Sequence, residues 1–337
     1  MRVQIEVVVW RGEIAESRHR VHAVAADPHG RALLDGGDLV TTYRSAAKPF
    51  QALPLVERGH AERWNVSDEE LALMCASHTG SPRHVECVRG ILGRLGVPES
   101  ALVCGYHDPL DSESLARLRA HPEERSPVYN NCSGKHAGML ALALAEGWPI
   151  EGYERPEHPV QKAVRASVAE LGGLSSAAVQ TAVDGCGVPV FALPLAAMAR
   201  AYARLASASA EGEVRERALA HIRGAMMSHP RATGGAERFA TQLMEAMPGR
   251  VVAKGGAEGL ECLGLPERGL GLAVKVGDGG TRAVGPAVIE VLDHLGVLSE
   301  VERERLQSLR SPRLKNVAGR EVGRIEAGVR AWSSAAS

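Results

Sequence analysis

VQIEVVVW (residues 3–10) decides the fold class together with GLGLAVKVGDGG (residues 269–280), which lies near the other end of the sequence. β-Branched residues dominate the first stretch and recur in the second, as is typical of strands. A further strand-like run, residues 19–27, ends in the turn signal DPHG, which predicts an antiparallel start. We therefore predict an α+β (mixed) fold, in which N- and C-terminal segments share one antiparallel sheet.

The middle of the chain is expected to be mainly helical, with Gly or Pro between most of the segments. Helical periodicity covers residues 83–95, 112–120, 134–146, 159–171, 195–207, 212–228 and 236–247. Further strand-like stretches lie at residues 188–193, 250–256 and 260–266. With no linker in view, we predict a single two-lobed catalytic domain, residues 1–337. The sheet lobe would come from about 1–60 and 250–337, and the helical part from about 61–249.

The composition favours a small-molecule partner. The 337 residues are 45% hydrophobic and carry a formal charge of −1, which gives no global attraction to nucleic acid or to an anionic membrane. The N-terminus lacks the pattern of a secretory signal, and no apolar run approaches membrane-spanning length, so a cytoplasmic location is expected. In that compartment the six scattered cysteines are more plausibly thiols or metal ligands than disulfides.

Lysine is rare in this chain and is therefore informative. Lys and Arg total 39, and the six lysines are residues 48, 135, 162, 254, 275 and 315. Arginine keeps its proton in proteins, whereas a desolvated lysine can lose its proton and serve as a base or a ligand.

The first candidate constellation is RSAAKPF (residues 44–50), where Ser45 and Lys48 are three residues apart at an expected helix start. Helical spacing would put both side chains on one face. A lysine with a pKa lowered by burial could then take the serine proton and activate the nucleophile. A capping serine beside a solvated lysine explains the motif about equally well.

A second cluster, CASHTG (residues 75–80), follows an apolar run that begins with the capping box Ser67 and Glu70. Ser77 or Thr79 could relay a proton or orient a substrate. Without other evidence, the favoured interpretation is a helix C-terminus closed by hydroxyls and Gly80.

A third cluster, YNNCSGKH (residues 129–136), brings amides, a thiol, an amine and an imidazole to a helix start. Backbone N–H groups there favour a carboxylate or an oxyanion. Cys132 with Lys135 or His136 has a short metal-ligand spacing, but another ligand must come from elsewhere. DGCG (residues 184–187) could supply it, although an inter-strand turn with a buried thiol is the simpler interpretation.

The fourth cluster, KGGAEG (residues 254–259), follows the strand-like residues 250–253. It is either a glycine-rich hairpin or a lysine on an edge strand that brings a second amine near Ser45. The later KVGDGGTR (residues 275–282) lacks the full phosphate-binding loop pattern, which excludes an NTPase of that type.

Taken together and in order, RSAAKPFQ, CASHTGSPRHV, NNCSGKHAGML, DGCGVPVFALPL, KGGAEG and GDGGTRAVGPA resemble the bacterial L-asparaginase II family of the rhizobial type. The resemblance spans nearly the whole chain. It implies a fold like that of serine β-lactamases and glutaminases, a homodimer, and hydrolysis of L-asparagine to L-aspartate and ammonia.

The resemblance also implies roles for individual residues. The implied catalytic residues are Ser45 as nucleophile with Lys48, and Ser77 with Lys254. The implied zinc (Zn2+) ligands are Cys132, Lys135 and Cys186, with zinc supporting substrate binding. The implied substrate contacts are Arg44, His78, Asn131, Asp184 (for the amino group) and Gly255.

Residue chemistry and resemblance agree on two-step acyl transfer. A glutaminase or another amidase on the same scaffold is the nearest alternative. A penicillin-recognising hydrolase shares SxxK and Lys-Gly-Gly but acts outside the cytoplasm. A zinc-stabilised binding protein without turnover is the alternative from a different class. His136 stays open as a rival to Lys135, because a lysine ligand must be neutral.

Overall fold

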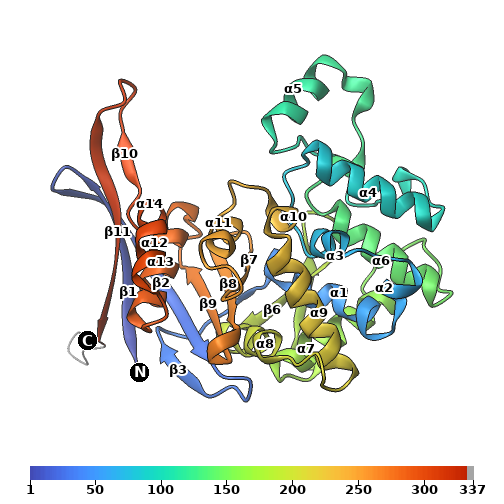
Figure 1. The fold of residues 1–337 in the computed structure, drawn as a ribbon, viewed down its shortest axis with the longest axis horizontal. Helices are drawn as coiled ribbons and strands as arrows, with labels where there is room; N and C mark the ends of the chain where they lie inside the picture. Colours follow the sequence, from blue (N-terminus) through green and yellow to red (C-terminus); the bar gives the residue numbers. More distant parts are fainter. Residues whose placement is uncertain (332–337) are drawn as a thin grey trace.

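The computed structural model describes residues 1–331, which form a large antiparallel sheet at one side of the molecule and a mainly helical part at the other (Figure 1). The strands of the large sheet are β1 (Val3–Arg11), β2 (Ile14–Ala26), β3 (Ala32–Asp35), β7 (Val252–Gly255), β8 (Leu260–Leu265), β9 (Leu270–Val276), β10 (Arg313–Lys315) and β11 (Glu321–Ala331). They run in the order β10-β11-β1-β2-β9-β8-β7, and β3 pairs with β2. The first and last strands of the described chain are therefore neighbours.

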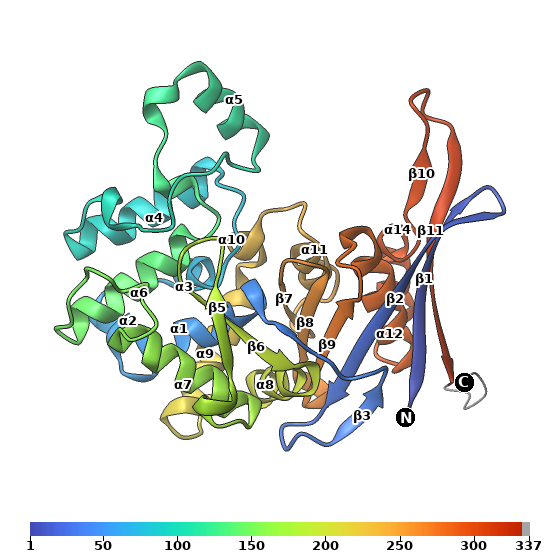
Figure 2. The same ribbon diagram turned by 180° about the vertical axis from the view of Figure 1, so that it is seen from behind.

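A second sheet is smaller and lies within the helical part (Figure 2). Its strands are β4 (Val40–Thr42), β5 (Gln180–Val183) and β6 (Pro189–Pro194), in the order β4-β6-β5. Within residues 1–331 the named strands of both sheets pair with one another in antiparallel fashion.

The helices occupy most of the middle of the chain and cover the large sheet. They are α1 (Lys48–Glu57), α2 (His60–Arg63), α3 (Asp68–Met74), α4 (Pro82–Leu95), α5 (Ser112–Ala120), α6 (Ser133–Ala145), α7 (Pro159–Gly172), α8 (Leu195–Ser207), α9 (Val214–Ser228), α10 (Pro230–Gly234), α11 (Phe239–Ala246), α12 (Val284–His294), α13 (Glu300–Arg305) and α14 (Gln307–Arg310). Among residues 1–331, none of them combines the length and apolar character that crossing a membrane needs.

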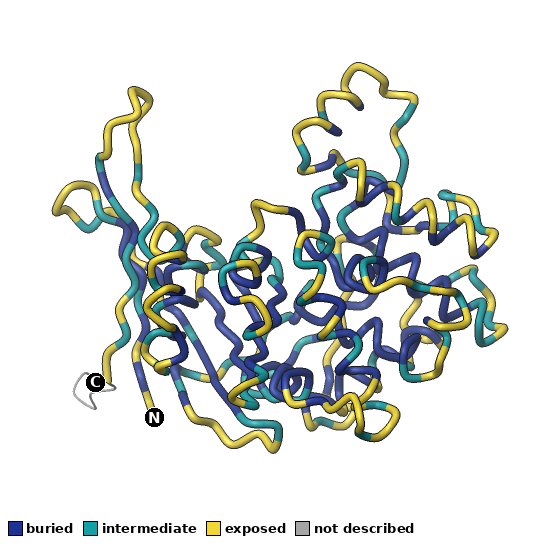
Figure 3. Tube along the Cα trace, in the orientation of Figure 1, coloured by how far each residue is buried: buried dark blue, intermediate teal, exposed yellow. Residues whose placement is uncertain are grey.

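The central strands are buried on both faces, and the period of two along β9 explains how (Figure 3). Leu272 and Val274 face a core shared with α12 and α11, whereas Ala273 faces the core that α8 and the other helices complete. Helix α8 packs on β9, β8 and β2, and α12 packs on β9, β1 and β11. The large sheet thus separates two hydrophobic cores, one on each face.

The α+β prediction is confirmed, and so is the antiparallel sheet built from both ends of the chain. The capping box also forms: Ser67 Oγ accepts from the backbone N–H of Glu70, and the Glu70 carboxylate accepts from the backbone of Ser67. The proposed division into lobes stays a prediction. Helix α1, which lies before residue 60, packs against α6, α7 and α9 of the helical part.

Candidate active site

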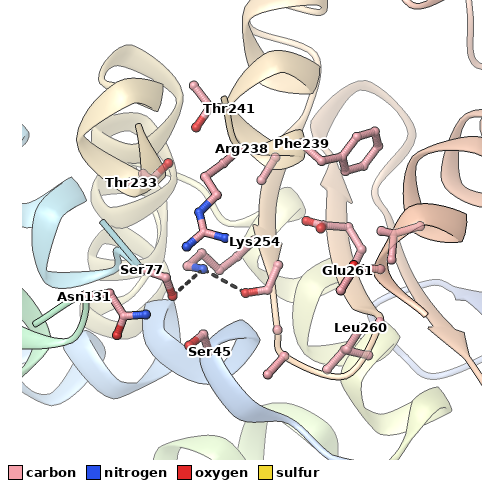
Figure 4. Close-up of a pocket in the computed structure, with 18 residues that line it drawn as sticks. Ser45, Ser77, Asn131, Thr233, Arg238, Phe239, Thr241, Lys254, Leu260 and Glu261 are labelled. Carbon is pink, nitrogen blue, oxygen red and sulfur yellow. Dashed lines mark hydrogen bonds between the residues drawn. The ribbon is translucent and has the colours of Figure 1, made fainter. Parts of the chain in front are cut away.

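A cleft of about 260 Å³ lies where the edge of the large sheet meets the helical part (Figure 4). Its walls come from the 3₁₀ turn η1 (Arg44–Ala47), the segment after α3, the α10–α11 region and the β7–β8 hairpin. The lining residues are Ser45, Ser77, Asn131, Thr233, Gly234, Arg238, Phe239, Ala240, Thr241, Lys254, Gly255, Gly256, Ala257, Gly259, Leu260, Glu261, Thr281 and Val284.

Ser77 lies between two buried amines. Lys48 Nζ and Lys254 Nζ are each 3.1 Å from Ser77 Oγ. Lys48 reaches it from the first turn of α1, and Lys254 from β7, the edge strand of the large sheet. Lys48 is 1% exposed and Lys254 is 4% exposed, so water screens a charge on either amine poorly. One hydroxyl is therefore in contact with two amines, of which Lys254 lines the cleft and Lys48 does not.

Burial lowers the pKa of both amines below that of an exposed lysine. It lowers the pKa of Lys254 to about 7, helped by the nearby positive charge of Lys48 and opposed by Glu261. Burial also lowers the pKa of Lys48, and the Cys132 charge opposes that shift. At neutral pH a substantial fraction of Lys254 is uncharged, which a general base requires.

Ser45 lines the cleft but is not hydrogen-bonded to Lys48 among the described side chains. The Lys48 amine instead donates to the carbonyl of Ala76, to Ser77 and to Cys132 Sγ at 3.3 Å. Ser45 belongs to η1, whereas Lys48 begins α1, so regular helical spacing does not relate the two. The Ser45–Lys48 pair consequently stays a prediction.

Arg44 bends the chain just before Ser45. It has a φ of 47°, in the left-handed region that non-glycine residues seldom adopt. Its guanidinium Nε lies 3.0 Å from Asp184 Oδ1, an ion pair that joins η1 to the loop after β5. Such a conformation persists where the surroundings hold it, and it fixes the direction in which the turn presents Ser45.

Two thiols and an amine gather behind the Ser77 contacts. Lys135 Nζ is 2.9 Å from Cys186 Sγ, and a side-chain hydrogen bond joins Cys186 to Cys132. All three residues are buried: Lys135 is 3% exposed, Cys186 is 6% exposed and Cys132 is 7% exposed. The bond from Cys186 and the charges of Lys48 and Lys135 hold the pKa of Cys132 well below its usual value, although burial opposes them.

This donor set is compatible with zinc. Two sulfurs and one nitrogen are ligands that zinc accepts, and they leave a position open. Within residues 1–331 no group of three His, Cys, Asp or Glu side chains could hold a metal, so Lys135 would have to contribute. Burial lowers the pKa of Lys135, but the neighbouring thiolates outweigh that effect and raise it overall. Metal binding would therefore have to displace a proton from this amine.

The sequence model of the L-asparaginase II family matches residues 7–327. The chain belongs to the L-asparaginase II family. No curated protein matches it. Membership in this family supports asparaginase-type amide hydrolysis, and it implies a small-molecule amide as substrate.

The residues expected to contact the substrate of this L-asparaginase II family member divide into those that line the cleft and those that do not. Asn131 and Gly255 line the cleft, in agreement with a role in substrate contact. Asp184 and Arg44 lie outside the lining and are paired with each other. The His78 ring is buried, with Nε2 2.9 Å from Ser133 Oγ and Nδ1 accepting from the backbone of Gly80. The roles of all five residues as substrate contacts stay predictions.

His136 makes contacts different from those of Lys135, which lies beside Cys186. Its Nδ1 is 2.6 Å from the Tyr153 hydroxyl, and its Nε2 has no partner among the described residues. Consecutive helical residues point in different directions, so Lys135 and His136 cannot both face Cys186. The contacts favour Lys135 over His136 as the ligand.

Sequence reasoning missed two charged cleft residues of this family member, Arg238 and Glu261. Arg238 precedes α11 and is one of many arginines in the chain. Glu261 interrupts an otherwise apolar strand, β8, and a buried acid in such a strand was the one available signal.

Proposed function

We propose that this protein hydrolyses L-asparagine to L-aspartate and ammonia through an acyl-enzyme on a cleft serine. One observation carries the proposal: the Ser77 hydroxyl lies 3.1 Å from each of two buried lysine amines, in a cleft that Ser45 also lines. Such an arrangement can remove a proton from a hydroxyl near neutral pH. Family membership supplies the class of substrate.

In the proposed reaction, Ser45 Oγ attacks the carbon of the side-chain amide, and its proton passes to the Ser77–lysine group. Ser77 hands that proton to the neutral amine of Lys254, as its contact with Nζ supports. The same proton then returns to the departing nitrogen, and ammonia leaves. Water next attacks the β-aspartyl ester, its proton restores the serine hydroxyl, and L-aspartate is released.

Lys48 has a different part in this scheme. Its amine is held by Ala76, Ser77 and Cys132, so it is less free to move than Lys254. A positive charge there lowers the pKa of Lys254 and orients the Ser77 hydroxyl. We propose that Lys48 positions Ser77 and, through it, supports the activation of Ser45.

The first test is ammonia release by the purified protein from L-asparagine and L-glutamine at equal concentrations. We expect kcat/KM for asparagine to be higher by about 10- to 200-fold, the usual discrimination for one methylene. A preference for glutamine would identify a glutaminase. Binding of either amino acid without ammonia release would favour the binding protein, and acylation by a labelled β-lactam would favour a penicillin-recognising hydrolase.

We also propose that Cys132, Lys135 and Cys186 hold a zinc ion, because their contacts place two sulfurs and a nitrogen together. When bound, the ion would supply a fixed positive charge that helps to position substrate. A homodimer is a further proposal, drawn from the family resemblance, and light scattering of the purified protein tests it.

Zinc binding predicts a measurable effect of Cys186→Ser. The purified protein should contain about one zinc per chain by elemental analysis, and the variant should contain much less, because serine is a poorer zinc ligand than thiolate. The KM for asparagine should rise in step. Cys87→Ser is the matched control, since Cys87 is partly buried and outside this group. Unchanged zinc in Cys186→Ser, or unchanged substrate affinity after chelation, would contradict the proposal.

A further inference from the structure

Arg238 places a guanidinium in the cleft without a protein partner. Figure 4 shows it extending from the segment before α11 toward Ser77 and Lys254. Among residues 1–331 its side chain makes no hydrogen bond or ion pair, although a guanidinium offers five donors. By contrast Arg231, seven positions earlier, lies 2.7 Å from Glu245 Oε1 and is not a lining residue.

Glu261 lines the cleft together with Arg238 and attracts its charge, but the two form no ion pair within residues 1–331. Among the described residues, the other titratable side chains of the lining are Lys254 and Glu261. Glu261 is 3% exposed, and its Oε1 has no hydrogen-bond partner among residues 1–331. Burial raises the pKa of Glu261 to about 8, although the charges of Lys254 and Arg238 oppose that shift. Arg238 is exposed as a whole residue, and arginine keeps its charge in proteins.

Arg238 consequently presents to the cleft a guanidinium whose donors no described side chain occupies. A planar guanidinium with free donors is suited to a carboxylate, which it can bind through two parallel hydrogen bonds. The other arginine near Ser45, Arg44, is already paired with Asp184 and lies outside the lining. Arg238 is therefore the guanidinium that an anionic group in this cleft would meet first.

We propose that Arg238 binds the carboxylate of the substrate and makes the protein selective for short amides that carry one. This inference rests on the proposed function. A carboxylate held at Arg238 would turn the other end of a four-carbon amide toward Ser45 and Ser77, which line the same cleft. Anchoring of this kind lowers KM and also raises kcat, since it orients the reacting carbon.

Three amides separate the contributions of the two charged groups of asparagine. L-Asparagine has both groups, succinamate lacks the amine, and 3-aminopropanamide lacks the carboxylate. We expect Arg238→Gln to lower kcat/KM by about 100-fold for asparagine and succinamate, and to change 3-aminopropanamide by less than about threefold. Arg238→Lys should restore part of the loss, because it keeps the charge without the planar fork.

Arg231→Gln is the matched control and should leave all three rates unchanged, and thermal melts should show that both glutamine variants fold. Equal losses of Arg238→Gln on all three amides would overturn the proposal, because they would indicate a structural effect. Selective loss in Arg44→Gln but not in Arg238→Gln would overturn it in favour of the other arginine.

Calorimetry separates this inference from the proposed function. If the unmodified protein releases no ammonia from any of the three amides, the proposed function fails on its own. Titration with succinamate then decides the role of Arg238. Binding that is weaker in Arg238→Gln than in Arg231→Gln supports a carboxylate site, and equal binding in the two variants overturns it.

Discussion

Replacing Ser45 with alanine should lower kcat for asparagine by about 10⁴-fold or more, because the oxygen that forms the acyl ester is removed. Ser77→Ala should cost less, about 10²- to 10³-fold, since the proposed role of Ser77 is proton transfer. Steady-state ammonia release measures both effects. Rapid quenching of the unmodified protein with asparagine, followed by peptide mapping, should locate the aspartyl adduct on Ser45.

Ser209→Ala is the control for these variants, because Ser209 is exposed and lies outside the cleft lining. An aspartyl adduct on Ser77, with activity retained in Ser45→Ala, would reverse the assignment. That outcome has a clear structural basis, since Ser77 is the hydroxyl that both amines contact directly. Loss of activity in Ser45→Ala with the adduct at Ser45 would support the assignment as proposed.

Replacing Lys254 with methionine should lower kcat by about 10³-fold, because methionine fills a similar volume but cannot accept a proton. The pH profile is the more specific readout. The pKa of Lys254 is about 7 in the folded protein, so its amine is charged below that pH and neutral above it. A base acts when neutral, and kcat/KM of the unmodified protein should therefore rise between pH 6 and 8, with an inflection near 7.

The residual activity of Lys254→Met should lack that inflection. Lys162→Met is the matched control, since Lys162 lies exposed on α7, and it should keep both the rate and the profile. Activity that falls as the pH rises through 7 in the unmodified protein would contradict a neutral amine as base. An inflection that persists in Lys254→Met would assign it to another group.

Local sequence signals predicted much of the fold. β-Branched residues marked β1, and the capping box at Ser67 marked the start of α3. The sequence did not mark β11, whose residues 321–331 include two glycines and several charges. That strand is defined by its pairing with β1 rather than by its own propensity, and such tertiary preference is not readable from one segment.

The site was predictable as a set of residues but not as a set of contacts. Spacing of three suggested that Ser45 and Lys48 share a helical face, yet the boundary between η1 and α1 falls between them. Lys48 extends instead toward Ser77. Arg238 carried no local signal at all, because its significance comes from having no partner among residues 1–331 in the folded structure.

The pairing of β1 with β11 has a consequence for how the protein forms. Val3 lies opposite Ala331, and the register continues to Arg11 opposite Gly323, so this part of the sheet joins residues more than 300 positions apart. During synthesis β1 can pair with β2 early, but it can pair with β11 only after nearly all of residues 1–331 have been made. We expect the pairing of β1 with β11 to form slowly and late in folding. Until it forms, the unpaired edge of β1 must be protected from pairing with other chains.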